Sequence, residues 1–348
     1  MTDLNQLLRK NIKNLIPYSS ARNEYQGEAS VFLDANENPF NEPFNRYPDP
    51  LQVQLKKVIA RIKNVKPEMI FLGNGSDEAI DLIVRAFCEP GTDNIVAVDP
   101  TYGMYKVCAD INNVEYRKVL LTPSFEPDVD ALMQKTDHHT KIIFLCSPNN
   151  PTSNSFSAER IINILKAFDG IVVLDEAYID FSSGKGFLPS LHEYHNLVIL
   201  QTFSKAWGMA GIRLGMAFAD PGIIAVLSKI KYPYNINILT LKTALESLKD
   251  TSGKEKWVSS IIQQRDVLEK ELKSVPFVLH VFPSDANFLL IKVNRPRELY
   301  QFLVSKRIII RDRSSVSLCE GCLRITIGTA AENRKLTEAL KTYQETKL

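Results

Sequence analysis

Short apolar runs alternate with helical stretches between residues 55 and 250, and this alternation constrains the fold more than any other feature. The apolar runs are residues 70–72, 95–98, 142–146, 171–174 and 197–201. Segments with helical periodicity, such as residues 55–62, 79–87 and 157–168, lie between or beside them. Buried strands separated by helices predict an α/β fold, with a mostly parallel sheet and helices on both of its faces.

A change of pattern near residue 252 divides the chain. Val258, Ile261, Leu268 and Leu272 recur at helical spacing with one charged interruption at Arg265, which predicts a long amphipathic helix. Strand patterns at 287–292 and 323–327 and helical patterns at 298–305 and 332–343 follow. We therefore expect an N-terminal arm (1–35), a large domain (36–252) and a smaller α+β domain (253–348). The arm is expected to pack with the small domain and with a dimer partner.

Composition excludes several classes of protein. The 348 residues include 42 basic and 40 acidic side chains, which gives no general electrostatic reason to bind nucleic acid or an anionic membrane. No apolar run is long enough to cross a bilayer, and Asp3 interrupts any secretory signal. Five cysteines fit a reducing cytoplasm. The Cys319/Cys322 and His192/His195 pairs lie far apart in the sequence without a zinc fingerprint, so no metal site is expected.

Polar residues follow every predicted strand of the large domain. These segments are residues 73–78, 99–102, 147–152, 175–178 and 202–205. Ligands of open α/β sheets bind at the carboxyl ends of the strands. The sequence therefore predicts that these polar groups surround one crevice.

The chemistry of these groups points to one cofactor. The turn at 73–76 precedes a helix, and its N–H groups, with Ser204 and Arg213, suit a phosphate. Asp175 at the end of an apolar strand needs a positive partner. Lys205 becomes nucleophilic if burial and nearby positive charge lower its pKa. Pyridoxal 5′-phosphate (PLP) has an anionic group, a ring nitrogen and an aldehyde that match this set.

Two acidic residues, Asp77 and Glu78, follow the predicted phosphate turn and would repel an anion if they faced it. We expect both side chains to cap the first turn of the helix and to point away from the crevice.

The motifs also carry a family resemblance. Residues 149–152 (Asn-Asn-Pro-Thr), 175–178 (Asp-Glu-Ala-Tyr) and 204–215 (Ser-Lys through Arg213 to Gly215) resemble the fold-type I PLP-dependent aminotransferases. Segments 15–18, 33–39, 46–48, 85–91, 100–105 and 321–329 resemble the histidinol-phosphate aminotransferase family of class II, so the similarity spans about residues 10 to 340. Ser153 stands where that family usually has glycine.

The resemblance implies roles at the cofactor. Lys205 would hold PLP covalently and move a proton at the substrate α-carbon, while Asp175 would keep the ring nitrogen protonated. Tyr178 and Asn150 would bond the ring oxygen, and Tyr102 would stack on the ring. The phosphate ligands would be Ser76, the backbone N–H of Asp77, Thr202, Ser204, Arg213 and, from the neighbouring subunit of a homodimer, Tyr47.

Substrate-binding residues are expected in the small domain and the arm. In residues 323–327 the apolar side chains alternate with Arg324 and Thr326, so Arg324 is free to face the crevice. The resemblance gives Arg324 the anionic group of each substrate, with Arg311, Tyr18 and Asn36 as helpers.

The reaction implied by the resemblance is PLP-dependent transamination in histidine biosynthesis. L-Histidinol phosphate and 2-oxoglutarate would give imidazole acetol phosphate and L-glutamate. A threonine-phosphate decarboxylase or a broad aromatic aminotransferase of the same fold remains an alternative. A regulator that only senses PLP is a further alternative, but residues 1–30 are too few for the DNA-binding domain that such regulators carry.

Overall fold

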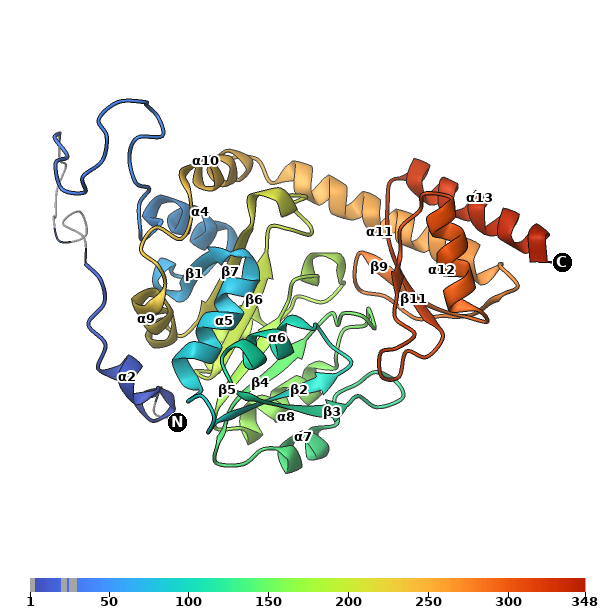
Figure 1. The fold of residues 1–348 in the computed structure, drawn as a ribbon, viewed down its shortest axis with the longest axis horizontal. Coiled ribbons are helices and arrows are strands. Elements are labelled where there is room, and N and C mark those ends of the chain that lie inside the picture. The colour runs from blue at the N-terminus through green and yellow to red at the C-terminus, as the bar shows by residue number, and fades with distance from the viewer. Residues whose placement is uncertain (1–3, 20–23, 25–29, 348) are drawn as a thin grey trace.

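A computed structural model describes residues 4–19, 24 and 30–347, and its large domain is built on a mixed seven-stranded sheet (Figure 1). The strand order is β1-β7-β6-β5-β4-β2-β3, and only the pairings of β7 with β1 and β6 are antiparallel. The strands are β1 (Ile70–Asn74), β2 (Asn94–Asp99), β3 (Glu115–Leu120), β4 (Thr140–Cys146), β5 (Ile171–Asp175), β6 (Leu197–Thr202) and β7 (Leu214–Ala219).

Helices cover both faces of this sheet, because alternate residues of each buried strand point to opposite sides. Val96 and Val98 of β2 join one core, whereas Ile95 and Ala97 join the other. The first core includes α4 (Val53–Lys63), α7 (Val129–Lys135), α8 (Ala158–Ala167) and α10 (Ile238–Ser247). The second includes α5 (Gly75–Phe87), α6 (Met104–Ile111) and α9 (Pro221–Ile230). The predicted α/β architecture with a mostly parallel sheet is confirmed.

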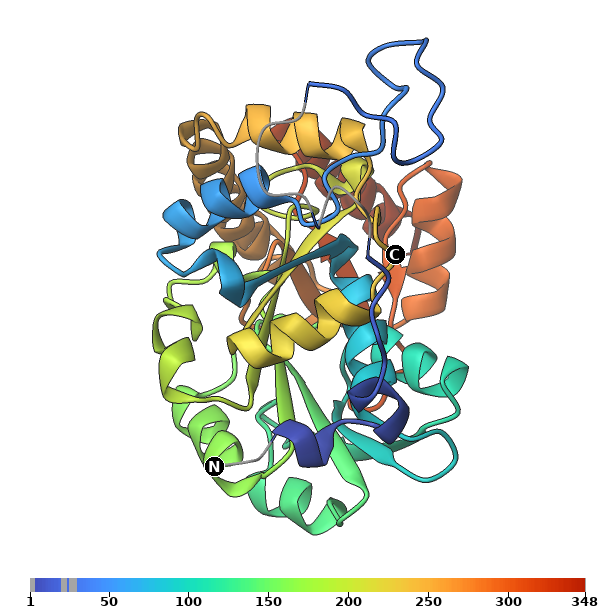
Figure 2. The ribbon, with the colours of Figure 1, turned by 90° about the vertical axis from the view of Figure 1, so that its left-hand side faces the viewer.

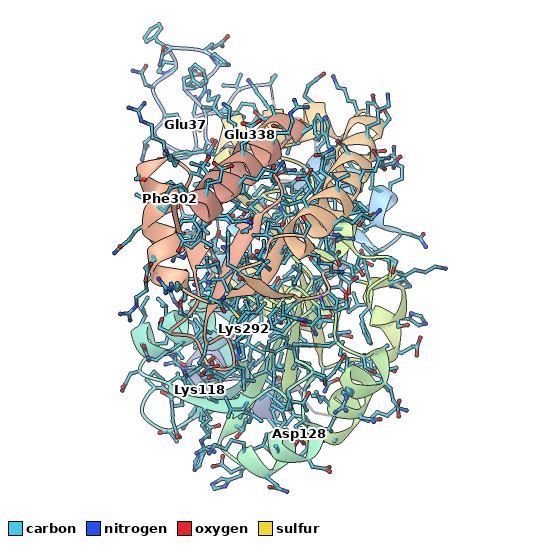
Figure 3. The ribbon with its side chains drawn as sticks, turned by 90° about the vertical axis from the view of Figure 1, so that its right-hand side faces the viewer. Glu37, Lys118, Asp128, Lys292, Phe302 and Glu338 are labelled. Atoms are coloured by element: carbon cyan, nitrogen blue, oxygen red, sulfur yellow. The ribbon has the colours of Figure 1, made fainter. Side chains whose placement is uncertain are left out.

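The small domain is a four-stranded antiparallel sheet in the order β10-β11-β9-β8. Its strands are β8 (Val278–Val281), β9 (Phe288–Val293), β10 (Arg311–Asp312) and β11 (Cys322–Thr326), and its helices are α11 (Ser252–Lys273), α12 (Pro296–Ser305) and α13 (Ala330–Lys347). In Figure 3, Phe302 of α12 and Glu338 of α13 mark this domain, and Lys118 and Asp128 mark the large domain below it.

Helix α11 joins the two parts, and its charged interruption has a structural reason. Arg265 Nη1 donates to the carbonyl oxygens of Phe181 (3.2 Å) and Ala286 (2.9 Å). Arg265 therefore ties the helix to the backbone that follows β5 and to the backbone that precedes β9.

The described start of the arm corrects one expectation. Helices α1 (Leu4–Leu7) and α2 (Lys10–Lys13) pack on the large domain and not on the small one. Arg9 N donates to Ala86 O (3.1 Å), and Lys229 Nζ donates to Ile12 O (2.8 Å). Figure 2 shows these helices against the lower part of the large domain.

Residues 30–52 form a loop that projects from the body in both views (Figures 1 and 2). The loop exposes large apolar side chains, among them Leu33 and Phe40. Its end is anchored by Asp49, whose carboxylate accepts from the N–H groups of Leu51 (2.8 Å) and Val53 (2.6 Å) at the start of α4. Within the described part of the chain, no helix is both long and apolar enough to cross a membrane.

Candidate active site

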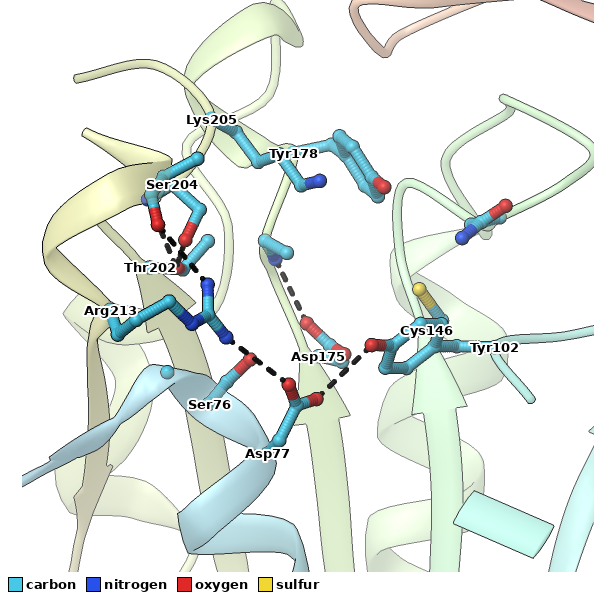
Figure 4. Close-up of a pocket in the computed structure, with 14 residues that line it drawn as sticks. Ser76, Asp77, Tyr102, Cys146, Asp175, Tyr178, Thr202, Ser204, Lys205 and Arg213 are labelled. Atoms are coloured by element: carbon cyan, nitrogen blue, oxygen red, sulfur yellow. Dashed lines mark hydrogen bonds and ion pairs between the residues drawn. The ribbon is translucent and has the colours of Figure 1, made fainter. Parts of the chain in front are cut away.

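A pocket lies at the carboxyl ends of the parallel strands and collects ten of the residues predicted from the sequence (Figure 4). These are Ser76, Asp77, Tyr102, Asn150, Asp175, Tyr178, Thr202, Ser204, Lys205 and Arg213. Gly75, Cys146, Ala177 and Ala210 complete the lining. The crevice predicted from the strand ends is therefore present. Its residues come from the ends of five strands, β1, β2, β4, β5 and β6, and from the segments that follow them.

One end of the pocket is suited to an anion. Helix α5 begins at Gly75, and the first N–H groups of a helix lack acceptors inside it. Gly75 N donates to Arg213 O (2.8 Å), which brings the arginine beside the helix start. Gly215 permits this approach, since a Cβ there would lie 2.1 Å from Ser76 N. Thr202 Oγ1 donates to Ser204 Oγ (3.0 Å), so two hydroxyls face the same end.

Asp77 does not point away from the crevice as expected. Its Oδ1 accepts from the Tyr102 hydroxyl (3.1 Å), and its Oδ2 lies 3.5 Å from Arg213 Nη2. The cationic arginine holds this carboxylate inside the pocket wall. Glu78 does follow the expectation: it turns back and accepts from Asn74 N (2.5 Å).

Asp175 is a buried carboxylate that lacks a cationic partner. The residue is 3% exposed, and burial raises its pKa to about 6. Its Oδ2 accepts from the Tyr105 hydroxyl (2.9 Å), and its Oδ1 accepts from Ala177 N (3.0 Å). Among the described residues it forms no ion pair, so the carboxylate is suited to a protonated ring nitrogen.

Tyr105 was not predicted as a site residue. It lies three positions after Tyr102, whose carbonyl oxygen accepts from Tyr105 N (3.4 Å) in the turn that leads into α6, and the two rings meet edge-on. That spacing is the signal by which the sequence could have indicated it.

Lys205 carries the nucleophile of the pocket. Burial lowers its pKa, the charges of Arg324 and Arg213 lower it further, and Asp175 and Asp77 raise it. Its Nζ lies 5.5 Å from the centroid of the Tyr178 ring, and Figure 4 shows both side chains above the end of β5. A buried amine with a lowered pKa is more often neutral and can attack an aldehyde.

Arginines from the small domain reach the edge of this pocket. Arg324 on β11 donates to Asn150 Oδ1, and its guanidinium lies 5.1 Å from the centroid of the Phe288 ring. Leu323, Ile325 and Ile327 face the core of the small domain, as the strand alternation predicts.

Two further arginines lie on the neighbouring strand segment. Arg311 is exposed and pairs in register with Arg324. Arg313, not predicted as a site residue, has a buried Nε without a partner in the described chain, and its pKa is lowered to about 10 by burial and by the charges of Arg324 and Arg311.

Besides Arg324 and Arg311, three predicted residues are absent from the pocket lining. Tyr47 stacks on Tyr234, with ring centroids 4.4 Å apart, and stays half exposed. Tyr18 is exposed, and Asn36 occupies the projecting loop with a φ of 53°. The structure of one chain does not bring these three to the crevice.

Ser153 holds the turn after Asn150 in a conformation that favours glycine. Its φ is 69°, and the buried hydroxyl donates to Pro283 O (3.0 Å). The serine thus keeps the left-handed turn and adds a bond to the segment before β9.

The residues present fit PLP and offer little to a metal ion. The anion end, the unpaired carboxylate of Asp175 and the amine of Lys205 match the phosphate, ring nitrogen and aldehyde of PLP. No three His, Cys, Asp or Glu side chains gather as a metal-binding group within the described residues.

Comparisons with known proteins identify the chain as an aminotransferase. Residues 21–340 match the model of aminotransferase class I and II. The chain is 59% identical to a histidinol-phosphate aminotransferase of Bacteroides fragilis over 99% of this chain and 100% of that protein. The histidinol-phosphate aminotransferase of Clostridium acetobutylicum has a similar structure (TM-score 0.80, 27% identity, 87% of this chain and 92% of that one). The enzyme of Sinorhizobium meliloti, solved in complex with PLP, shares the fold (TM-score 0.77, 24% identity, 86% and 83%).

Proposed function

This chain belongs to the histidinol-phosphate aminotransferase family of class I and II aminotransferases, and we propose that it transfers the amino group of L-histidinol phosphate to 2-oxoglutarate. It is a PLP-dependent enzyme. The products would be imidazole acetol phosphate and L-glutamate, in histidine biosynthesis.

The cluster of Arg311, Arg313 and Arg324 carries the substrate assignment. These side chains lie on adjacent strand segments beside the Lys205 pocket, and their positive charges act on one another. Unbalanced guanidinium charge favours a phosphate monoester, which arginine binds through paired hydrogen bonds. An aromatic amino acid such as phenylalanine offers these arginines one carboxylate with a single negative charge, whereas a phosphate monoester brings more charge and three acceptor oxygens.

PLP supplies, when bound, an electron-withdrawing ring that stabilises negative charge at the substrate α-carbon. The protein's share of the chemistry begins with Lys205, whose amine is placed to take a proton from that carbon and to return it. Asp175 stabilises the proton on the ring nitrogen, which its buried and unpaired carboxylate is suited to do.

The remaining pocket residues bind and orient. Tyr178 and Asn150 would bond the ring oxygen, and Tyr102 would stack on the ring; all three line the pocket. The phosphate would be held by Ser76, Thr202, Ser204, Arg213 and the backbone N–H of Asp77, which gather at one end of the pocket. Arg324 would bind the phosphate of one substrate and a carboxylate of the other, so the two substrates occupy the site in turn.

A homodimer completes the proposed site. The loop of residues 30–52 projects from the body (Figure 1) and exposes large apolar side chains, which supports contact with a second copy. Tyr47 would then reach the phosphate of the neighbouring subunit, and Tyr18 and Asn36 would help to bind substrate. A cytoplasmic location is supported by five free and buried cysteines.

The test is the reaction catalysed by the PLP-loaded protein. We expect glutamate to form in proportion to the L-histidinol phosphate consumed when 2-oxoglutarate is present. Threonine phosphate should release no carbon dioxide, and phenylalanine should react much more slowly. Preferred decarboxylation of threonine phosphate, or preferred turnover of phenylalanine, would contradict the proposal.

A further inference from the structure

Among the residues that the structure describes, Tyr105 is the one whose side-chain hydroxyl donates a hydrogen bond to the Asp175 carboxylate. Its hydroxyl donates to Asp175 Oδ2 at 2.9 Å, and both groups are buried. The other oxygen, Oδ1, accepts from Ala177 N at 3.0 Å. Each carboxylate oxygen therefore has one neutral donor from the protein.

The position of Tyr105 is fixed by packing. The residue is 0% exposed, and its ring stacks on Phe144 with centroids 4.6 Å apart and an interplanar angle of 14°. The ring of Tyr102 meets it edge-on at 5.6 Å. Because the ring cannot turn without opening this core, the hydroxyl stays aimed at Asp175.

The other groups around Asp175 give it little help to stay ionised. The groups that act on it are Asp77 from α5, Tyr102 and Tyr105 from the α6 segment, Cys146 from β4, Glu176 and Tyr178 after β5, and Lys205 after β6. Asp77 and Glu176 are carboxylates, which favour the protonated form of Asp175. Lys205 is the one cation of this set, and burial lowers its pKa, so its positive charge is weakened as a partner for Asp175.

We propose that Tyr105 is a positioning residue for the reaction, which holds the Asp175 carboxylate ionised and aimed at the ring nitrogen of the cofactor. The inference rests on the proposed function. Tyr105 touches neither substrate nor cofactor in this role and acts through Asp175 alone. A donor to the charged form of a carboxylate stabilises that form.

Tyr105→Phe removes the hydroxyl and keeps the ring that stacks on Phe144. The readout is the equilibrium dissociation constant of PLP for the apoprotein, measured by equilibrium dialysis from pH 5 to pH 9. We expect binding to weaken roughly tenfold at neutral pH, because a hydrogen bond to a charged group is lost. The acid limb of the affinity profile should move up by about one pH unit.

The same substitution in an Asp175→Asn background separates positioning from packing. With a neutral amide at position 175, loss of the hydroxyl should change PLP affinity by less than about twofold. Tyr116→Phe, which removes a half-buried tyrosine hydroxyl that packs on the same core, is the matched control and should leave the affinity profile unchanged.

The outcomes distinguish this inference from the function on which it rests. A Tyr105→Phe protein with the affinity and acid limb of the parent would overturn the inference, as would an equal loss in the Asp175→Asn background. Failure of the parent chain to bind PLP would overturn the proposed function as well.

Discussion

Asp77 Oδ2 lies 3.5 Å from Arg213 Nη2, so a carboxylate already faces the arginine that we assign to the cofactor phosphate. The same Asp77 accepts a hydrogen bond from Tyr102, the residue assigned to stack on the ring. The Asp77 carboxylate thus orients two groups assigned to the cofactor, but its negative charge would repel the cofactor phosphate.

Asp77→Asn should strengthen PLP binding. The amide oxygen keeps the bond from Tyr102, and the charge that competes for Arg213 is removed. The pair is partly exposed to solvent, so its worth is about 0.5–1 kcal/mol, and we expect a two- to fivefold lower dissociation constant. Equilibrium dialysis of the apoprotein measures it, and weaker binding by the Asn variant would show that the carboxylate supports the phosphate site.

Arg324→Ala should raise the KM for L-histidinol phosphate while the cofactor stays bound. Loss of a charge-assisted contact with an anion costs about 1.5–3 kcal/mol, which corresponds to a KM roughly ten- to a hundredfold higher. Steady-state kinetics gives the KM, and the cofactor absorbance verifies loading. Arg334→Ala on the exposed side of α13 is the matched control, and equal KM values for the two variants would remove Arg324 from the substrate site.

The dimer proposal predicts complementation between two defective chains. Tyr47→Ala and Lys205→Ala should each be impaired alone. After mixing and exchange of subunits, half of the dimers are hybrids and each hybrid has one intact site. Activity should therefore return to about a quarter of the parent value. Activity that stays at the level of the unmixed chains would place Tyr47 in the site of its own subunit, or outside it.

Asp175→Asn should stabilise the apoprotein at neutral pH while it abolishes transamination. Burial raises the pKa of Asp175 from 3.8 to about 6, so the folded chain binds this proton more tightly than the unfolded chain. The carboxylate therefore lowers stability as pH rises from 3.8 to about 6, and the cost persists above that range.

The Asp175→Asn substitution should raise the free energy of unfolding by at most about 3 kcal/mol at pH 8, and it should leave that free energy unchanged below about pH 4. Urea denaturation of both apoproteins at the two pH values measures this difference. A gain that is the same at pH 4 and pH 8 would show that titration of Asp175 is not its source.

The large sheet was predictable because its strands are continuous apolar runs between helices. Two strands were not predicted. β7 begins at Leu214, at the end of the motif that closes with Gly215, and this segment was interpreted only as a binding segment. β3 lies at the edge of the sheet and carries the charged residues Glu115, Arg117 and Lys118, so it lacks the continuous apolar pattern of the central strands. Edge strands keep polar residues that central strands exclude.

The site was predictable where polar groups follow the ends of strands. The prediction failed where the direction of a side chain depends on a neighbour from a distant part of the sequence. Asp77 was expected outside the crevice by its own charge, but Arg213 from a distant segment holds it inside. The hydroxyl of Tyr105 finds Asp175 only because α6 packs beside β5's end, a contact between residues 70 positions apart. The arm packs on the large domain through Leu4, Leu7 and Ile12. The weak hydrophobic periodicity of the arm did not predict this contact.

The most direct test of the central claim is an absorbance scan of the PLP-loaded protein before and after addition of L-histidinol phosphate alone. The account predicts that the band of the lysine-bound cofactor is replaced by that of the amino form of the cofactor, far more readily than with threonine phosphate or phenylalanine. Lys205→Ala should lack the lysine-bound band from the start. A band that is present in the parent chain but ignores L-histidinol phosphate would contradict the account.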